Sequence, residues 1–378
     1  MRIAFLGAEG VPYHAAFAKI TEEIGSRLVA RGHDVIVYGR RRCVPDSSPY
    51  RGMRRVPLPS WNTKHMDTLT FALLSAVHVL RADNVDIAHI HGIAPAVWTL
   101  LPRLRAIKTV VHIHSTDWRR AKWGRSARLF LRLGEYAAVR WSDAAIAVSP
   151  VVKDYLENRY GKAVHYVSNG VDILPTPEPE HLRQLGLKSG QYLLFMGRLV
   201  PEKGCHYLLE AVRRVNPPLP LVMAGGESHS REYMHRLEEA ANSQVRFLGY
   251  ATGPLKEELL AHACIYIQPS DLEGMSLTLL EAMSYGRCII MSDIPENTVV
   301  AKDCAVTFRA GDVNDLTEQL ASLLRQPQRV QELGRRAKRV AASHQSWNDV
   351  ATEVEAIYRL LLQPGRAADA GREAGKLS

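Results

Sequence analysis

The sequence predicts an α/β protein of two domains, each with parallel strands that alternate with helices. The chain opens with MRIAFLG, an apolar run typical of a buried strand, then a helix from about Phe17 to Ala30 and a second strand, DVIVYGR. A strand, a loop, a helix and another strand also follow one another from Cys264 to Asp293. With 378 residues, the chain is too long for one ordinary hydrophobic core, so two domains are expected.

Strands and helices continue to alternate through the first half of the chain, as expected for a parallel sheet. We expect a loop rich in Arg and Pro from Arg40 to Pro59, a helix from about Thr68 to Ala82, and short strands at 86–91 and 109–114. Both strands end in His-Ile-His, and because side chains alternate along a strand, the two histidines of each pair share a face. Four histidines could hold a metal ion, but no Asp or Cys has ligand spacing beside them, so a buried core remains the other interpretation.

Charge and composition limit the classes of partner. The formal net charge of +9 favours anionic partners such as a nucleotide or a phospholipid surface, and we find no nucleic-acid motif. The five cysteines are scattered without a C-x-x-C pair, which is typical of reduced core thiols in a cytoplasmic protein. The longest uncharged run, Ile87 to Pro102, is shorter than the ~20 residues of a membrane span. Glu9, directly after the first strand, argues against a signal peptide.

Two carboxylates stand out in the stretch from Cys264 to Asp293. Glu273 lies in the loop after the strand, and Glu281 lies in the helix expected over 277–285. The amides at the start of this helix, near Gly274 to Leu277, have no partner within the helix and suit an anionic or oxygen-rich ligand. Carboxylates accept hydrogen bonds, so the pair would suit a ligand rich in hydroxyl groups. A pair of solvated surface charges is the alternative interpretation.

A second polar turn lies in QYLLFMGRLVPEKG. The strand is expected to end at Met196, Gly197 lets the chain turn, and Arg198 and Lys203 precede the next helix. Two cations in a strand-to-helix turn can clamp a diphosphate, the arginine through its planar fork and the lysine as a point charge. As isolated surface charges they would be unremarkable.

Together these motifs resemble those of the family-4 retaining glycosyltransferases of glycosyltransferase group 1, which have the GT-B fold. The segment EGMSLTLLEAMSYG resembles the E-x7-E element of that family, GRLVPEKG resembles its diphosphate element, and VVHIHSTDW resembles the segment that carries its cleft histidine. The resemblance covers nearly the whole chain and is nearest to members that build bacterial polysaccharides. It implies two Rossmann-like domains facing one another across a cleft, with a C-terminal helix that crosses back to the first domain. It also implies transfer of a sugar from a nucleotide-diphosphate sugar to an acceptor hydroxyl, with retention of the anomeric configuration.

The resemblance further implies roles for individual residues. Glu281 would bind the donor ribose, Glu273 would lie near the donor sugar, and His114 would line the cleft beneath that sugar. The implied catalytic residues are His114, Arg198, Lys203 and Glu273. The implied donor-binding residues are Arg198, Lys203, Gly249, Tyr250, Gly274, Met275, Ser276, Leu277 and Glu281. No metal or cofactor is expected, because the sequence has no D-x-D pair and the nucleotide-sugar is itself a substrate.

One departure from the family pattern keeps two alternatives open. Relatives commonly carry Gly-Gly before the first helix, where backbone meets the donor phosphates, whereas this chain has Ala15-Ala16, which puts that contact in doubt. A non-catalytic nucleotide-sugar binder is therefore one alternative. An NADP-dependent oxidoreductase is the other, because a dinucleotide-binding domain opens with the same βαβ unit and Arg40, Arg41 and Arg42 end the second strand. Against it, the first turn does not read G-x-G-x-x-G.

The domain bounds follow from the same pattern and from a proline-rich segment, ILPTPEPEH. We expect a first domain over 1–172, a linker over 173–187, a second domain over 188–345, a crossover helix over 346–363 with Trp347 and Tyr358 as packing anchors, and a disordered tail over 364–378.

A basic segment from Arg119 to Arg140 is expected to be helical. Its aromatic and aliphatic residues, Trp118, Trp123, Leu129 and Phe130, interleave with the cations. A solvated helix face is one interpretation, and a surface for an anionic membrane or a lipid-linked acceptor is the other. The expected partners are thus a nucleotide-sugar, a glycan or lipid-linked glycan of cell-surface polysaccharide synthesis, and an anionic membrane surface. The expected location is cytoplasmic, peripheral on the inner face of the membrane.

Overall fold

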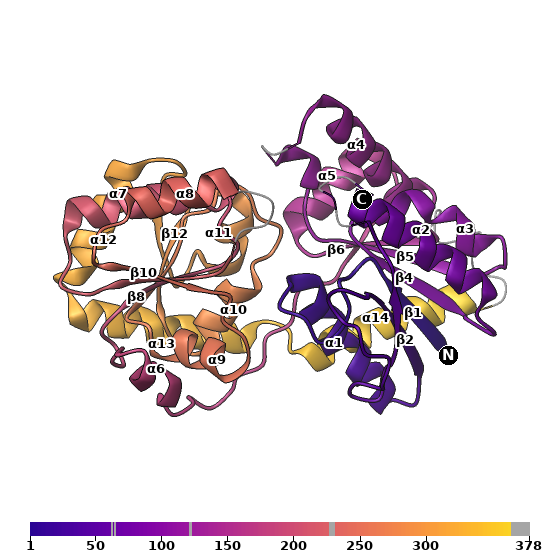
Figure 1. Cartoon of the computed structure of the whole chain (residues 1–378), viewed down its shortest axis with the longest axis horizontal. Helices are drawn as coiled ribbons and strands as arrows, with labels where there is room; N and C mark the ends of the chain where they lie inside the picture. The colour runs from indigo at the N-terminus through magenta and orange to yellow at the C-terminus, as the bar shows by residue number, and fades with distance from the viewer. Residues whose placement is uncertain (62, 64–65, 121–122, 227–230, 364–378) are drawn as a thin grey trace, which may run out of the picture. The chain divides into compact units, whose positions relative to one another are not determined.

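The computed structural model describes residues 1–61, 63, 66–120, 123–226 and 231–363. The chain divides into two compact units (Figure 1). The first unit is Met1–Gly170 together with the chain from Gln345 onward, and the second is Val171–His344. The tail expected to be disordered, 364–378, lies outside the described residues.

The first unit contains a seven-stranded sheet in which every pair of neighbouring strands is parallel. The strands are β1 (Arg2–Leu6), β2 (Asp34–Arg40), β3 (Arg54–Leu58), β4 (Ile87–His91), β5 (Lys108–Ile113), β6 (Ala144–Ala147) and β7 (His165–Tyr166). Their order is β3-β2-β1-β4-β5-β6-β7, so the chain reverses its direction of travel across the sheet between β1 and β4. Open α/β sheets bind ligands beside the carboxyl ends of the strands at such a reversal.

Helices cover both faces of this sheet (Figure 1). They are α1 (Ala16–Ala30), α2 (Met66–Arg81), α3 (Leu100–Arg103), α4 (Arg125–Arg140), α5 (Pro150–Tyr160) and α14 (Trp347–Leu362), with short 3₁₀ turns η1 (Pro95–Trp98) and η2 (Asp117–Arg119). Burying each face under a helical layer explains why the central strands read as continuous apolar runs. The strands predicted in MRIAFLG, in DVIVYGR, at 86–91 and at 109–114 and the helices predicted from about Phe17 and Thr68 are confirmed.

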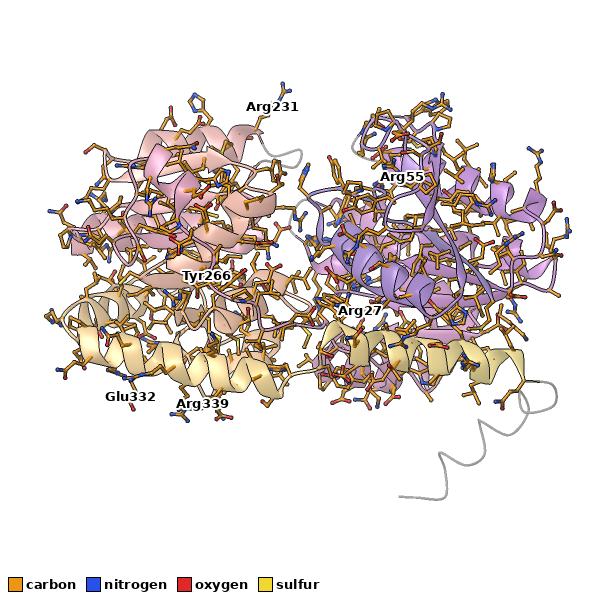
Figure 2. All side chains as sticks on the ribbon, turned by 90° about the horizontal axis from the view of Figure 1, so that it is seen from below. Arg27, Arg55, Arg231, Tyr266, Glu332 and Arg339 are labelled. Atoms are coloured by element: carbon orange, nitrogen blue, oxygen red, sulfur yellow. The ribbon has the colours of Figure 1, made fainter. Side chains whose placement is uncertain are left out.

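The last helix, α14, packs on α1 within the first unit, which confirms the expected crossing back to the first domain. Tyr358 is fully buried and Trp347 is 5% exposed, so both serve as the expected packing anchors. Polar contacts also join the two helices: Arg27, labelled in Figure 2, donates to the side chain of Asn348 at 3.0 Å, and Arg31 pairs with Glu355 at 3.0 Å.

The second unit repeats the architecture with a six-stranded parallel sheet. Its strands are β8 (Leu193–Met196), β9 (Leu221–Ala224), β10 (Val245–Gly249), β11 (Ile265–Gln268), β12 (Cys288–Ser292) and β13 (Val306–Phe308), in the order β10-β9-β8-β11-β12-β13. Here the direction of travel reverses between β8 and β11.

The helices of the second unit again form two layers. They are α6 (Glu180–Gln184), α7 (Cys205–Val215), α8 (Arg231–Ala240), α9 (Gly253–His262), α10 (Leu277–Ser284), α11 (Pro295–Ala301), α12 (Val313–Leu324) and α13 (Pro327–Ser343), with the 3₁₀ turn η3 (Pro201–Lys203). In Figure 1, α7, α8 and α12 cover one face of the sheet, and α9, α10 and α13 cover the other.

Two expectations were wrong in detail. The segment from Arg40 to Pro59 is not only a loop, because Arg54–Leu58 forms the edge strand β3, paired in parallel with β2. Its sequence, RRVPL, carries two charges and a proline, which are typical of an edge strand but obscure the strand pattern. The basic helix begins at Arg125 rather than Arg119, because Gly124 adopts an extended backbone directly before it. Apart from these two corrections, the short helix α6 lies within the predicted linker, 173–187, whose bounds stay a prediction.

Two further expectations concern the chain as a whole. All five cysteines are free thiols, and three of them are buried, as expected for core cysteines. Among the residues that the structure describes, none of the helices combines the length and the apolar composition that crossing a bilayer would require.

Candidate functional site

In the second unit, the loops that follow β8 and β11 meet at the reversal of strand order. Gly204 has a left-handed backbone, with φ of 66°, and a Cβ added there would lie 1.9 Å from the carbonyl oxygen of Pro269. The amide of Asp271 donates to the carbonyl of Glu202 at 2.9 Å. Only glycine permits this close approach. The turn that carries Lys203 is thereby held against the loop that carries Glu273.

This approach pairs two of the predicted site residues directly. The Lys203 ammonium lies 2.5 Å from Oε1 of Glu273, and the Ser270 hydroxyl donates to the same oxygen at 2.7 Å. The Glu273 residue is only 8% exposed, so its charge is held by fixed partners rather than by bulk water. The pair places a cation and a carboxylate beside the carboxyl ends of the two central strands.

A buried polar network supports the start of α10. The Ser276 hydroxyl accepts a hydrogen bond from the backbone amide of Leu279 and donates to the side-chain oxygen Oε1 of Gln268 at 2.9 Å. The Tyr266 hydroxyl donates to Thr278 at 2.9 Å, and its side chain, labelled in Figure 2, lies inside the unit. Burial raises the pKa of Tyr266. Because each of these groups has a partner, the first turn of α10 is fixed with its amides at the end of β11.

Glu281, in the second turn of α10, has one paired and one unpaired oxygen. Its Oε1 lies 2.6 Å from the ammonium of Lys256, which comes from the first turn of α9. Its Oε2 is buried and has no hydrogen-bond partner among the described residues. A buried acceptor without a partner costs stability, so this oxygen is available for a ligand hydroxyl. Lys256, which contacts the predicted site residue Glu281, was not identified by the sequence analysis.

The other predicted donor-binding residues of this unit lie around the same strand ends. Arg198 follows β8 by two residues and is half-buried. Gly249 ends β10 with φ of 66°, and Tyr250 next to it is 44% exposed. A Cβ on Gly226 would lie 2.3 Å from the Tyr250 ring, so that glycine lets the ring pack on the turn after β9. In the α10 turn, Gly274, Met275 and Ser276 are buried and Leu277 is half-buried.

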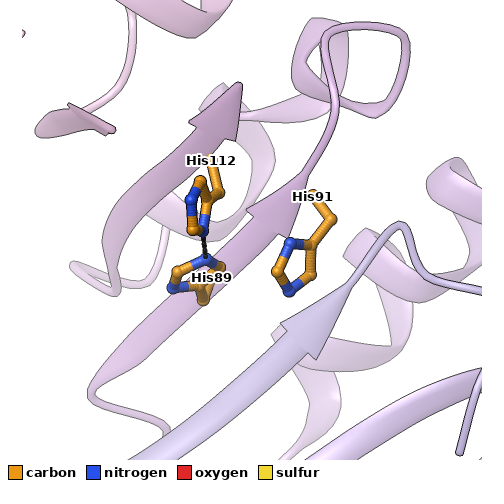
Figure 3. A group of neighbouring side chains, drawn as sticks. All are labelled: His89, His91 and His112. Carbon is orange, nitrogen blue, oxygen red and sulfur yellow. Dashed lines mark hydrogen bonds between the residues drawn. The ribbon is translucent and has the colours of Figure 1, made fainter. Parts of the chain in front are cut away.

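In the first unit, the predicted catalytic histidine belongs to a cluster of four. His89 and His91 come from β4, His112 comes from β5, and His114 follows β5 directly. Their exposed fractions are 0%, 0%, 1% and 8% in that order. Figure 3 shows three of them, with His89 bonded to His112. The cluster lies towards the carboxyl ends of β4, which borders the reversal in this sheet, and of β5. The rings within each His-Ile-His pair are 4.8 Å and 4.3 Å apart, so the predicted shared face is confirmed.

The histidines form two hydrogen-bonded pairs. His89 Nε2 lies 3.3 Å from His112 Nδ1, and His91 Nδ1 lies 2.9 Å from His114 Nε2. The Tyr358 hydroxyl of α14 lies 2.5 Å from His89 Nδ1, which ties the first pair to the last helix. Burial, followed by the effect of neighbouring histidines, holds the pKa of His89, His91 and His114 well below the usual value, and burial lowers that of His112 to about 3. All four rings are therefore neutral at neutral pH.

The spacing of the cluster bears on the metal interpretation. One ring nitrogen from each of His89, His91 and His112 lies within 4.8 Å of the others. Two nitrogens on one tetrahedral zinc ion, at ~2.0–2.1 Å from it, are about 3.4 Å apart. The rings would have to move together before they could share an ion. The stacked arrangement instead resembles the buried core that the sequence analysis left open. Three ring nitrogens of the cluster have no hydrogen-bond partner among the described residues.

The departure at Ala15-Ala16 causes no strain. Ala15 precedes α1 with φ of −86° and ψ of 151°, an extended conformation that any residue adopts, and Ala16 begins the helix. The two alanines therefore fit the backbone of this turn without the left-handed freedom of glycine. Their methyl groups remain at the start of α1, next to the amides that lack helical partners.

Comparison with protein families gives one match in each half of the chain. Residues 178–340 match the model described as glycosyl transferases group 1, and residues 18–173 match the model described as glycosyltransferase family 4. The chain is also similar to curated bacterial proteins. It is 30% identical to alpha-maltose-1-phosphate synthase of Mycolicibacterium smegmatis over 257 residues, 60% of this chain and 65% of that protein. It is 26% identical to glycogen synthase of Mycobacterium tuberculosis over 398 aligned positions, 95% of this chain and 94% of that protein.

Solved structures share the fold across nearly the whole chain. Sucrose-phosphate synthase of Thermosynechococcus elongatus matches with a TM-score of 0.82 at 18% identity, covering 96% of this chain and 99% of that one. HepE of Anabaena, solved in complex with UDP-glucose, matches with a TM-score of 0.77 at 17% identity, covering 95% of this chain and 99% of that one.

Proposed function

This chain belongs to the family-4 glycosyltransferases of group 1, retaining enzymes with the GT-B fold, and we propose that it transfers a hexosyl group from a nucleotide-diphosphate sugar to a hydroxyl of a glycan. The observation that carries the proposal is the buried, unpartnered Oε2 of Glu281 beside the amides and cations at the β8–β11 reversal. That combination offers an acceptor for ribose hydroxyls and donors for a diphosphate at one edge of one sheet. The curated relatives named above, which make glucans or a maltosyl phosphate by their names, support a hexosyl donor.

The donor is proposed to bind along this edge. Glu281 accepts hydrogen bonds from the ribose, while Lys256 holds its other oxygen. Arg198, Lys203 and the first amides of α10 bind the diphosphate, and the base lies near Tyr250. Glu273 holds hydroxyls of the donor sugar, and its ion pair with Lys203, a proposed diphosphate ligand, supports a position next to the bond that breaks.

The chemistry proposed for this edge is electrostatic. As the glycosidic bond lengthens, negative charge grows on the departing diphosphate and positive charge grows on the sugar ring. Arg198, Lys203 and helix amides stabilise the negative charge, and the Glu273 carboxylate favours the positive charge. These groups are fixed before the donor arrives, because Glu273 is held by Lys203 and Ser270. In the proposed mechanism His114, which is neutral, contacts the donor sugar by hydrogen bonding rather than by charge.

A donor panel tests the proposal. Thermal shift with UDP-, GDP-, dTDP- and ADP-sugars should identify one stabilising nucleotide, and release of that free nucleoside diphosphate should accelerate when an α-glucan oligosaccharide is added. Stabilisation without any release, with or without acceptor, would favour the non-catalytic binder. Stabilisation by NADPH alone would favour the oxidoreductase. We expect activity to survive EDTA, and a complete loss restored by Mg²⁺ or Mn²⁺ would contradict the proposed metal-free mechanism.

A second part of the proposal concerns the acceptor and rests on α4. Trp118 and Trp123 pack against the core of the first unit, so they do not contribute to an exposed apolar surface. Leu129, Leu133 and Tyr136, spaced four and three residues apart, are instead 71%, 46% and 42% exposed. The single acid of this helix, Glu135, is fully buried against aromatic hydroxyls and the Trp118 indole.

The exposed face of α4 is therefore cationic and apolar at once. It also carries Arg125, Arg128, Arg132 and Arg140, all exposed. A helix with an apolar strip between arginines and no facing carboxylate binds anionic lipid surfaces. We propose that this face contacts an anionic membrane and brings the site to lipid-linked glycan acceptors.

Vesicle flotation tests that contact. Binding to phosphatidylglycerol vesicles should fall as salt rises, and should weaken in an Arg125→Ser, Arg128→Ser, Arg132→Ser variant, because each nearby cation contributes about 1 kcal/mol. A matched variant with three arginines of α13 changed, Arg335→Ser, Arg336→Ser and Arg339→Ser, should bind as wild type does. Equal recovery with neutral and anionic vesicles would leave α4 as a solvated helix face.

A further inference from the structure

The bond between His91 and His114 constrains both rings. The two residues come from neighbouring strands, and the Nδ1 of His91 and the Nε2 of His114 are 2.9 Å apart. The far nitrogens, Nε2 of His91 and Nδ1 of His114, are buried and have no hydrogen-bond partner among the described residues. Among the described residues, the hydrogen-bond partner of each ring is therefore the other ring.

Counting hydrogens limits the pair to two states. Two neutral imidazoles carry two ring hydrogens on four nitrogens. One hydrogen must lie between the rings, because two lone pairs facing each other across 2.9 Å would repel. If His91 donates it, His114 carries its own hydrogen on Nδ1. If His114 donates it, Nδ1 of His114 is a bare acceptor and His91 carries its hydrogen on Nε2.

The two rings must then share one tautomer. Both are protonated on Nδ1, or both are protonated on Nε2. A move from one state to the other turns Nδ1 of His114 from donor to acceptor while the pair stays neutral. A buried site can thus present either a donor or an acceptor to a ligand without the cost of burying a charge.

Aromatic packing keeps the rings in place for this bond. The Phe17 ring, from the first turn of α1, lies 4.6 Å from the His114 ring, and the Phe5 ring of β1 stacks on His91 at 5.7 Å. His112 stacks on His114 at 4.3 Å on the strand side. Stacking fixes the ring planes, but it does not choose which nitrogen carries the hydrogen. Among the described residues, that choice falls to the partner at Nε2 of His114, which is His91.

We propose that His91 is a positioning residue for the sugar-contacting His114: it couples the tautomer of His114 to its own, so that Nδ1 of His114 can either donate to or accept from a sugar oxygen. The catalytic effect of this coupling rests on the proposed function, whereas the hydrogen bond between His91 and His114 does not depend on it. A sugar hydroxyl can donate or accept, so the bound donor selects one state of the pair. In a change from the Nδ1 state to the Nε2 state, the shared hydrogen moves from His91 to His114, Nδ1 of His114 releases its proton to water, and Nε2 of His91 takes one up from water, so the pair keeps two ring hydrogens.

Three variants separate this role from packing. His91→Phe keeps a stacked ring and removes both nitrogens. His91→Asn places an amide where Nδ1 was, and an amide can donate to or accept from Nε2 of His114 as the imidazole does. Tyr358→Phe is the matched control, because it removes a hydroxyl from the same cluster that contacts His89 and neither residue of the pair.

The kinetic readout is nucleoside diphosphate release from the donor that stabilises the wild type. We expect His91→Phe to lower kcat about 3- to 10-fold, as loss of one neutral hydrogen bond allows, with donor KM nearly unchanged. His91→Asn should recover most of that loss, and Tyr358→Phe should keep the wild-type kcat. Wild-type kcat in His91→Phe, or an equal loss in His91→Phe and His91→Asn, would overturn the proposal.

A spectroscopic readout is independent of activity. Two-bond ¹H–¹⁵N correlation spectra of the ¹⁵N-labelled protein report which ring nitrogen of each histidine is protonated. His91 and His114 should show the same tautomer, and the pattern of His114 should change in His91→Phe. One residue protonated on Nδ1 and the other on Nε2 would overturn the pairing even if the enzyme were active. A correct pairing in a protein that releases no nucleotide from any donor would instead count against the proposed function.

Discussion

The two sheets place polar side chains at equivalent points but stabilise them in opposite ways. In the first unit, four neutral histidines after β4 and β5 are buried and bonded to one another. In the second unit, the predicted site residues after β8 and β11 include charged side chains, and Glu273 and Glu281 are each paired with a lysine. Neutral rings can be buried without counter-ions, whereas a buried carboxylate needs a fixed cation.

The difference indicates that the two units suit different parts of a ligand. A charged and paired site suits a ligand that itself carries charge, because a diphosphate can compete for Lys203. A neutral cluster suits a ligand part without charge, such as sugar hydroxyls. If this comparison is right, substitutions at the charged residues of the second unit should lower donor turnover more than substitutions in the histidine cluster. The size of the loss in the second unit should depend on whether the substitution removes a charge.

The largest effect is expected at the cation after β8. Lys203→Ala removes a charge-assisted hydrogen bond to the diphosphate, worth about 1.5–3 kcal/mol, and leaves Glu273 buried without its cation. We expect kcat/KM for the donor to fall about 10- to 150-fold. Steady-state kinetics would measure this, with Lys188→Ala on the exposed loop before β8 as the matched control. A change within about twofold would place the diphosphate elsewhere.

The two glutamates should fail in different ways. Glu273→Gln removes the carboxylate that favours positive charge on the sugar, so kcat should fall, by about tenfold for 1.4 kcal/mol. Glu281→Gln weakens ribose binding equally in ground and transition states, so donor KM should rise and kcat should stay nearly constant. Kinetics at varied donor concentration separate the two outcomes. The reverse pattern would mean that the donor lies the other way round along the strand ends.

The histidine cluster should make stability depend on pH. Each of the four has a folded-state pKa below its unfolded value, so the unfolded chain binds more protons and stability falls as pH drops through about 6.5. For His112, with a pKa of about 3, the contribution lost between pH 7.5 and 5.5 is about 1.4 kcal/mol.

Urea denaturation of the wild type and of His112→Phe at both pH values measures this contribution. The free energy of unfolding should fall less in the variant, by about that amount. An identical pH dependence in the two proteins would show that His112 is not a buried neutral ring, and the contrast between the two units would lose its basis.

The smallest effect is expected at Lys256. Lys256→Met keeps the length of the side chain and removes the charge that holds Oε1 of Glu281. Because this pair is partly exposed, we expect donor KM to rise only about 2- to 5-fold, with kcat unchanged. In the background of Glu281→Gln the same substitution should have no further effect on KM. Additive effects in the double variant would show that the two residues act separately.

The sequence by itself determined the local parts of both sites. Short apolar runs predicted the buried strands. The turns after them contain the candidate site residues: Arg198 and Lys203 after β8, Glu273 after β11 and His114 after β5. These predictions depend on neighbours in the chain. A strand of four or five residues followed by a polar turn can be recognised within a short window, and parallel strands direct such turns to one edge.

Only the tertiary structure decided which of these residues touch. Lys203 and Glu273 are 70 residues apart in the chain, and His89 and Tyr358 are 269 apart. Their contacts follow from strand order, which brings β8 beside β11, and from the return of α14 to the first unit. Lys256 was missed because nothing in its own segment marks it: a lysine in a first helical turn is ordinary until α9 packs beside α10. Strand order and helix packing depend on burial across the whole domain, and no local pattern encodes them.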